Sequence, residues 1–78
     1  MNIYAKKGAQ VAVTKESVKN GYDCDRAKAN AHLSVGAIYT VERTKAFSSR
    51  TEVYLQEFPG VVFNSVQFID VIETFSNN

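Results

Sequence analysis

Cys24 and His32 are the residues whose types suit a nucleophile with its general base, and the chain has one cysteine and one histidine. A thiolate–imidazole pair acts as a unit when its two side chains lie within hydrogen-bond reach, about 3 Å. If residues 24–33 form a helix, a rise of about 1.5 Å per residue separates the pair by roughly 12 Å. The spacing therefore argues against a Cys–His dyad.

The same segment, Asp23-Cys24-Asp25 with His32, brings together residue types that bind metals. Zinc sites need three or four ligands at recognisable spacing, which one cysteine and one histidine do not supply. A calcium loop needs more carboxylates and a glycine in register. We expect no metal and no other cofactor.

Paired carboxylates for acid–base chemistry would have to come from the acidic residues of the second half, which fall mostly at outward strand positions or turns. Carboxylates at such positions usually keep strands soluble. The four glycines are isolated from one another, which excludes a phosphate-cradling loop. The sequence therefore predicts a protein that is not an enzyme. The acidic residues concerned are Glu42, Glu52, Glu57, Asp70 and Glu73.

Four aromatic residues, Tyr22, Phe47, Tyr54 and Phe58, are more than so small a core needs. Exposed aromatic side chains that cluster favour a protein-binding or self-association surface. Arg50 would orient a partner at the rim of that surface. The alternative is that two or three of the aromatics cap the ends of the core.

Basic residues are concentrated in the first part of the chain, although the net charge of the whole is only +1. Together with nearby tyrosines, they offer an alternative function, nucleic-acid binding through stacking and phosphate contacts. The basic residues of this alternative face are Lys6, Lys7, Lys15, Lys19, Arg26 and Lys28.

Length and composition describe one small globular domain. The chain has 78 residues, of which 45% are hydrophobic and 22% charged, and a chain of this size buries roughly 60% of its unfolded surface. We expect a single domain over residues 1–78 with an ordered core at about 8–73. A lone cysteine forms no internal disulfide, and no apolar run has membrane-spanning length. These features predict a cytoplasmic protein without a membrane partner.

Alternating residues and turn signals predict five short strands and one helix. We expect strands over 9–15, 37–45, 51–58, 61–63 and 68–75, with the inward positions listed below. Asn20-Gly21 predicts a tight turn, and Pro59-Gly60 a type II turn. Asp25 is expected to cap a helix over 26–33 whose apolar face holds Ala27 and Ala31. The inward residues are Tyr39, Val41, Val53 and Leu55, while Ala9, Val11 and Val13 share one side of the first strand and Ile69 and Val71 one face of the last.

The segments "LSVGAIYTVERT" and "FPGVVFNSVQFIDV" resemble the second strand and the distal hairpin, 3₁₀ turn and last strand of SH3-like barrels. The resemblance implies a small five-stranded SH3-like barrel, with a short helix in the loop after the first strand. Residues 64–67 would form the 3₁₀ corner, with Phe63, Val66 and Phe68 as core residues around it. The pattern of short strands and turns along the whole chain also resembles that of short uncharacterised proteins of bacteria and their phages.

The chain departs from peptide-binding SH3 domains, because it has no tryptophan. We therefore expect a non-enzymatic binding module for a partner other than a proline-rich peptide. The partner is a protein or a second copy of the chain, bound through Tyr22, Phe47, Arg50, Tyr54 and Phe58.

Overall fold

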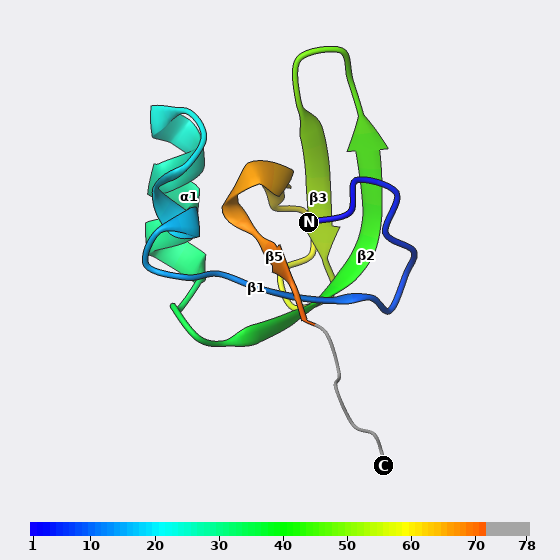
Figure 1. Ribbon diagram of the computed structural model, residues 1–78, viewed down its shortest axis with the longest axis horizontal. Coiled ribbons are helices and arrows are strands. Elements are labelled where there is room, and N and C mark those ends of the chain that lie inside the picture. Colours follow the sequence, from blue (N-terminus) through cyan, green and yellow to red (C-terminus); the bar gives the residue numbers. More distant parts are fainter. Residues whose placement is uncertain (72–78) are drawn as a thin grey trace.

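Alternating apolar residues form the strands of one antiparallel sheet (Figure 1). The structure, a computed structural model, describes residues 1–71, and over this range five strands follow the order β4-β3-β2-β1-β5. The strands are β1 (Gln10–Ala12), β2 (Ile38–Ala46), β3 (Thr51–Leu55), β4 (Val62–Asn64) and β5 (Ile69–Asp70). The predicted mainly β fold, with one helix after the first strand, is confirmed for this part of the chain.

Side-chain hydrogen bonds explain why the first strand, predicted over 9–15, ends at Ala12. After β1, the backbone N–H of Thr14 donates to Ser17 Oγ (2.8 Å), and the N–H of Ser17 donates to Thr14 Oγ1 (2.9 Å). This reciprocal pair starts the 3₁₀ turn η1 (Ser17–Lys19) in place of continued strand. The predicted strand over 68–75 is observed as β5, and its part beyond residue 71 lies outside the described residues.

The Pro59-Gly60 turn is confirmed and ends the β3–β4 hairpin. The N–H of Val61 donates to the carbonyl of Phe58 (3.2 Å), which closes a four-residue turn. Gly60 lies at the third position with φ of 82°, as a type II turn requires.

A bulge in β2 lets this long strand pair with two neighbours. Its first residues, 38–40, pair with β1, whereas Val41–Ala46 pair with β3, and the register shifts between Val41 and Arg43. Because a bulge bends its strand and increases the local twist, β2 curves along the sheet, as Figure 1 shows.

The outer strands β4 and β5 are joined by a second 3₁₀ turn, η2 (Ser65–Gln67), which packs against β3. Within residues 1–71, the ladders run from β4 through β3, β2 and β1 to β5, and none pairs β4 with β5. The closed SH3-like barrel therefore stays a prediction, whereas the 3₁₀ corner at residues 64–67 is confirmed.

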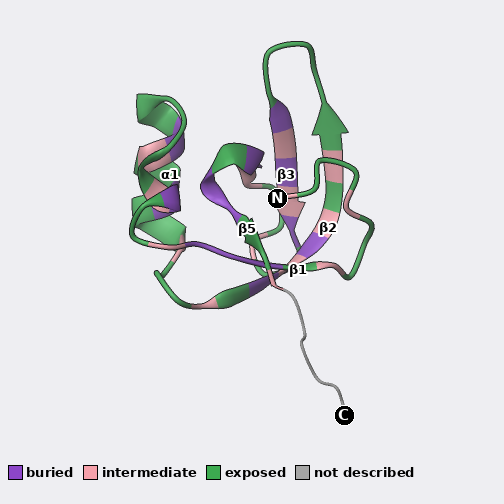
Figure 2. Cartoon of the chain, in the orientation of Figure 1, coloured by how far each residue is buried: buried purple, intermediate pink, exposed green. Residues whose placement is uncertain are grey.

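The predicted alternation identifies most of the core. The buried cluster consists of Val11, Val13, Tyr39, Val41, Val53, Leu55, Phe63 and Phe68. The prediction for Val66 is wrong, because its side chain is 49% exposed, whereas the neighbouring Gln67 is fully buried. The turn η2 points Gln67 inward, where its Nε2 donates to the carbonyl of Val18 (3.0 Å). Figure 2 shows buried positions concentrated on β3 and on the inner sides of α1 and η2.

Helix α1 (Asp23–His32) begins earlier than the predicted range of 26–33. Tyr22 is the N-cap residue, and the carboxylate of Asp25 in the first turn accepts the N–H of Tyr22 (2.8 Å). Asp25 therefore satisfies the helix start from within the helix, as the acidic residue of a capping box does. The predicted apolar face is also wrong, because α1 buries Asp25 and Ala29 and leaves Ala27 and Ala31 exposed.

Asp25 also joins the helix to the sheet. Asn64 donates from Nδ2 to Asp25 Oδ2 (3.0 Å), while Asn64 Oδ1 accepts the N–H of Val66 (3.2 Å) and caps η2. Asn20 Nδ2 donates to the carbonyl of Val66 (3.0 Å). We call Asn20, Asp25, Asn64 and Gln67 the polar seam, because their side chains connect the η1–α1 segment to η2 and β4.

The N-terminal segment packs on the far side of the sheet from α1 (Figure 1). The amino group of Met1 donates to the carbonyl of Phe68 (3.1 Å), and Thr44 Oγ1 donates to the carbonyl of Ile3 (2.9 Å). Met1 and Ala5 also contact the core. Contacts with the core thus begin before residue 8, the start that the sequence predicts. In residues 1–71, no helix combines the length and apolar character needed to cross a membrane.

Gly21→Ala should destabilise the protein more than Gly60→Ala. Both glycines have positive φ, so alanine is strained by about 1–2 kcal/mol at either position. Only at Gly21 would the new Cβ lie 2.8 Å from Asp25 Oδ2, whereas nothing lies within 4 Å at Gly60. Urea unfolding should show a total loss of about 2–4 kcal/mol for Gly21→Ala. Equal losses for the two variants would contradict this role of Asp25.

The Asp25–Asn64 hydrogen bond should appear as a coupling energy in a double-mutant cycle. Asp25→Ala and Asn64→Ala, alone and combined, should give a coupling of about 1.5–3 kcal/mol, the range for a hydrogen bond to a charged group. Urea unfolding measures each stability. Asp25→Ala combined with Thr44→Ala is the control and should be additive, since the two side chains share no partner. A coupling near zero for the first pair would show that the polar seam is not cooperative.

Candidate functional site

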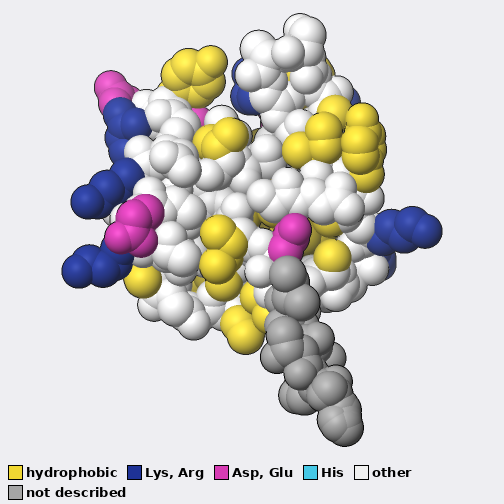
Figure 3. Space-filling model, in the orientation of Figure 1, with side chains coloured by type: hydrophobic (Ala, Val, Ile, Leu, Met, Phe, Trp, Pro, Cys, Tyr) yellow, Lys and Arg dark blue, Asp and Glu magenta, His cyan; other side chains and the backbone are white. Residues whose placement is uncertain are grey.

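A groove of about 300 Å³ lies between the start of α1 and the strands β3 and β4. We call it the helix–sheet groove. Figure 3 shows its mouth as a notch between the α1 side and the β2–β3 hairpin. One wall comes from Tyr22, Cys24, Asp25 and Lys28, and the other wall and floor from Arg50, Glu52, Val62, Phe63 and Asn64.

The sheet wall carries an ordered row of side chains from the β2–β3 hairpin, which we call the hairpin row: Phe47, Arg50, Glu52 and Tyr54. Arg50 donates to Glu52 Oε2 (2.9 Å), and the hydroxyl of Tyr54 donates to Glu52 Oε1 (3.1 Å). The guanidinium of Arg50 lies 5.5 Å from the ring centroid of Phe47, within cation–π distance. Both oxygens of Glu52 thus hold the row in one arrangement.

The ion pair changes the acid–base behaviour of both partners. The hydrogen bond from Arg50 holds the pKa of Glu52 below its ordinary value, and burial opposes this shift. Glu52 in turn raises the pKa of Arg50, which therefore stays charged. Glu52 is ionised at neutral pH and keeps accepting both hydrogen bonds.

The structure places the predicted aromatic residues in three different settings. Tyr22 is 60% exposed on the helix wall, and Phe47 is 46% exposed on the hairpin. Tyr54 is half-buried beneath Arg43, whose guanidinium lies 3.9 Å from the ring centroid. Phe58 does not reach the groove, because its ring packs against Tyr39, His32 and Phe63 with centroid separations of 5.7, 5.3 and 6.1 Å. Tyr22 and Arg50 thus line one groove, Phe47 lies beside Arg50, and Phe58 caps the core.

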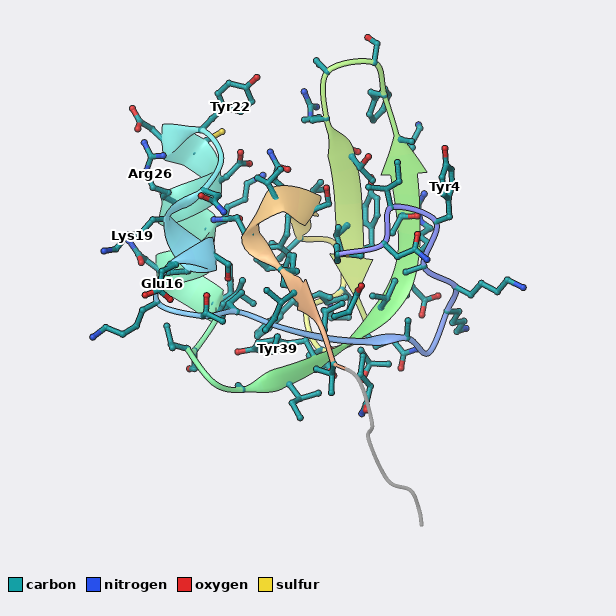
Figure 4. All side chains as sticks on the ribbon, viewed as in Figure 1. Tyr4, Glu16, Lys19, Tyr22, Arg26 and Tyr39 are labelled. Atoms are coloured by element: carbon teal, nitrogen blue, oxygen red, sulfur yellow. The ribbon has the colours of Figure 1, made fainter. Side chains whose placement is uncertain are left out.

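Most of the predicted basic residues lie on two separate flanks of the molecule. Lys6 and Lys7 belong to the N-terminal segment beside β2, where Lys7 pairs with Glu42 (3.5 Å). Lys19 and Arg26 lie on the outer side of the η1–α1 segment (Figure 4). Arg26 donates to the carbonyl of Gly21 (2.7 Å) and pairs with Asp23. Lys28 instead lines the helix–sheet groove and donates to the carbonyl of Val62, and Lys15 is exposed before η1, so the six residues form no single continuous face.

A family model described as "Bacteriophage T4 protein Y07B" matches residues 2–77. The chain belongs to this family. No curated protein and no solved structure matches the chain. The predicted resemblance to short phage proteins is confirmed by this match to nearly the whole chain.

In this phage-family protein, Cys24 and His32 occupy opposite ends of α1. Cys24 is exposed and lines the helix–sheet groove. The ring of His32 instead packs against Phe58 and Phe63. No group of three or more His, Cys, Asp or Glu side chains suited to a metal ion occurs within residues 1–71.

The sequence analysis named Cys24, Asp25 and Lys28 in other roles but did not predict that they line one groove, although their spacing could have indicated it. Cys24, Asp25 and Lys28 are separated by the three- and four-residue spacings that place side chains on one side of a helix. Asn64 joins them only because the chain returns to α1 through β4. No local pattern indicates that return.

A second missed feature is an apolar row across the outer face of the sheet. Ile38, Ala12 and Ile69 are direct register partners on β2, β1 and β5, and both isoleucines are exposed. This row follows from strand pairing rather than from any segment of the sequence, because its three residues come from distant parts of the chain.

Glu52→Gln should destabilise the protein at neutral pH and have less effect in acid. Because the folded pKa of Glu52 is lowered, its contribution is complete above the unfolded value of about 4.3 and disappears as pH falls through the folded pKa. Urea midpoints of the wild type and the variant, measured from pH 7 to pH 3, should therefore converge at low pH. In an Arg50→Gln background the pH dependence of this difference should shrink. A constant difference across the range would rule out the ion pair as its cause.

Proposed function

We propose that this phage-family chain is a non-enzymatic protein-binding module whose partner enters the helix–sheet groove. The observation that carries the proposal is that the exposed ring of Tyr22 lines a groove with the Arg50–Glu52 ion pair, while the centroid of the exposed Phe47 ring lies 5.5 Å from the Arg50 guanidinium. Tyrosine and arginine are enriched among residues that dominate protein interfaces. An accessory or inhibitory role towards a protein of the bacterial host suits a small phage protein of this kind.

The ordered state of the groove supports this proposal. Arg50 is oriented by Glu52, and Glu52 is fixed in turn by the hydroxyl of Tyr54. On the helix wall, Asp25 is held in place by the hydrogen bond from Asn64 on the sheet wall. Binding to side chains that are already ordered loses less conformational entropy than binding to mobile ones.

We further propose that the domain is an SH3-like barrel. The strand order, with η2 between the two outer strands, agrees with that architecture. The loop after β1 and the β2–β3 hairpin then flank one groove. The partner is not a proline-rich peptide, because the chain has no tryptophan, and because Gln67 and Phe68, which stand where peptide-binding SH3 domains have a groove-lining Asn-Tyr pair, are both buried.

Tyr22→Ala and Phe47→Ala should each weaken partner binding by about tenfold or more, as for interface hot spots. The tagged protein is first used to capture partners from lysate of the infected bacterial host, with nuclease present, and calorimetry then gives Kd for a purified partner. Tyr4→Ala is the matched control, since Tyr4 is exposed but lies across the molecule from Tyr22 (Figure 4). This variant should bind normally.

The alternative of nucleic-acid binding predicts a different outcome of the same experiment. Material captured through the basic residues would disappear on nuclease treatment, and binding would weaken steeply with salt. Lys6→Gln and Lys19→Gln would then reduce binding while Tyr22→Ala would not. Self-association would appear as a second copy of the chain, measurable by sedimentation.

A further inference from the structure

The carboxylates of the helix–sheet groove are already engaged by the protein itself. Both oxygens of Glu52 accept hydrogen bonds, one from Arg50 and one from Tyr54. Asp25 Oδ2 accepts two, one from the backbone of Tyr22 and one from Asn64. Each of these carboxylates thus accepts two hydrogen bonds from the protein and is held in place by them.

The cations of the groove have donors in excess. Arg50 carries five N–H groups, and its side chain donates to Glu52 alone among residues 1–71. The Lys28 ammonium carries three, and over the same residues it donates only to the carbonyl of Val62 (3.1 Å). Both side chains are exposed enough to turn their remaining donors towards a ligand, since 46% of the Arg50 side chain is accessible and Lys28 is exposed.

Net charge does not decide which ligand fits, because the four charged groups, Asp25, Lys28, Arg50 and Glu52, sum to zero. Local hydrogen-bonding capacity decides it. The cations of the groove keep free N–H donors, whereas its carboxylates are held by donors of the protein. Such a groove favours a ligand that supplies acceptors, and an ionised acceptor forms stronger hydrogen bonds than a neutral one. The start of α1 also favours negative charge, since the helix dipole is positive there.

We propose that the helix–sheet groove recognises a short acidic segment of the partner protein. An Asp or Glu side chain of that segment takes the remaining donors of Arg50, with Lys28 as the second cation. An apolar or aromatic neighbour of this residue lies against Tyr22, which lines the groove, and Phe47, which is exposed beside Arg50. This inference rests on the proposed protein-binding function and names the chemistry of the segment that is bound.

A displayed library of random peptides, selected on the purified protein, tests this specificity without a known partner. Selected peptides should be enriched in Asp or Glu beside an aromatic or aliphatic residue. Synthetic versions with amidated C-termini should lose about tenfold or more in affinity when the acidic residue is replaced by its amide. Fluorescence anisotropy gives the Kd values.

Variants of the groove provide the second half of the test. Arg50→Gln should reduce affinity for the selected peptides by about tenfold, and Lys28→Gln by a smaller factor. Arg50→Lys keeps the charge but loses the planar fork, and should lie between Arg50→Gln and the wild type. Lys15→Gln removes the same charge outside the groove and should leave affinity unchanged. Since Lys28 is exposed, Lys28→Gln stays informative even if Arg50→Gln disturbs the hairpin.

The outcomes separate this inference from the proposed function. Enrichment of neutral or basic peptides whose binding depends on Tyr22 and Phe47 would overturn the acidic specificity and leave the binding module intact. The same holds if Arg50→Gln and Lys28→Gln both bind with unchanged affinity. Failure to select any peptide, together with failure to capture a partner protein, would overturn both.

Discussion

The hydrogen bond between the Asp25 carboxylate and the Asn64 amide connects the two halves of this domain. Asp25 belongs to the first turn of α1 and Asn64 to the junction of β4 and η2. Each also has a local task, since Asp25 receives the N–H of Tyr22 and Asn64 caps η2. Through these hydrogen bonds, Asp25 and Asn64 connect the start of α1, the turn η2 and the two walls of the groove.

Polar contacts of Asp25, more than apolar burial, hold the start of α1 in place, whereas His32 at its other end packs on Phe58 and Phe63. The buried residues of the helix are Asp25 and Ala29, and burying one methyl group contributes only about 0.8 kcal/mol. A hydrogen bond to a charged group contributes about 1.5–3 kcal/mol, and Asp25 accepts two. Polar contacts require defined geometry, so the helix is held at one position where a purely apolar contact would allow it to slide. That precision fixes the position of Tyr22 in the wall of the groove.

The core and the groove depend on different kinds of information in the sequence. Alternation along β2 and β3 was sufficient to identify Tyr39, Val41, Val53 and Leu55 as buried, because a strand places successive side chains on opposite faces. The same reasoning does not apply inside a 3₁₀ turn. Val66 was therefore assigned to the core in place of Gln67, whose buried amide reaches a carbonyl far away in the chain.

The candidate site was predictable in part. Tyr22, Phe47 and Arg50 were recognisable as aromatic and basic residues in successive loops, and the structure places Tyr22 and Arg50 in one groove with Phe47 beside Arg50. Phe58 looked equivalent by residue type, but it packs on His32 and Tyr39. Residue type and spacing do not distinguish an aromatic ring that caps the core from one that faces solvent, since this depends on which elements lie above it.

By itself, the sequence determined the mainly β class, the number of strands, the helix, the Pro59-Gly60 turn and most of the core, because these features follow from local backbone preferences and short-range periodicity. Its match to residues 2–77 also determined membership of a phage protein family. Only the tertiary structure decided that Asp25 and Asn64 meet, that Lys28 and Arg50 share one groove and that Phe58 leaves it. These contacts join residues that are distant in the sequence, and their geometry exists only after the strands have paired.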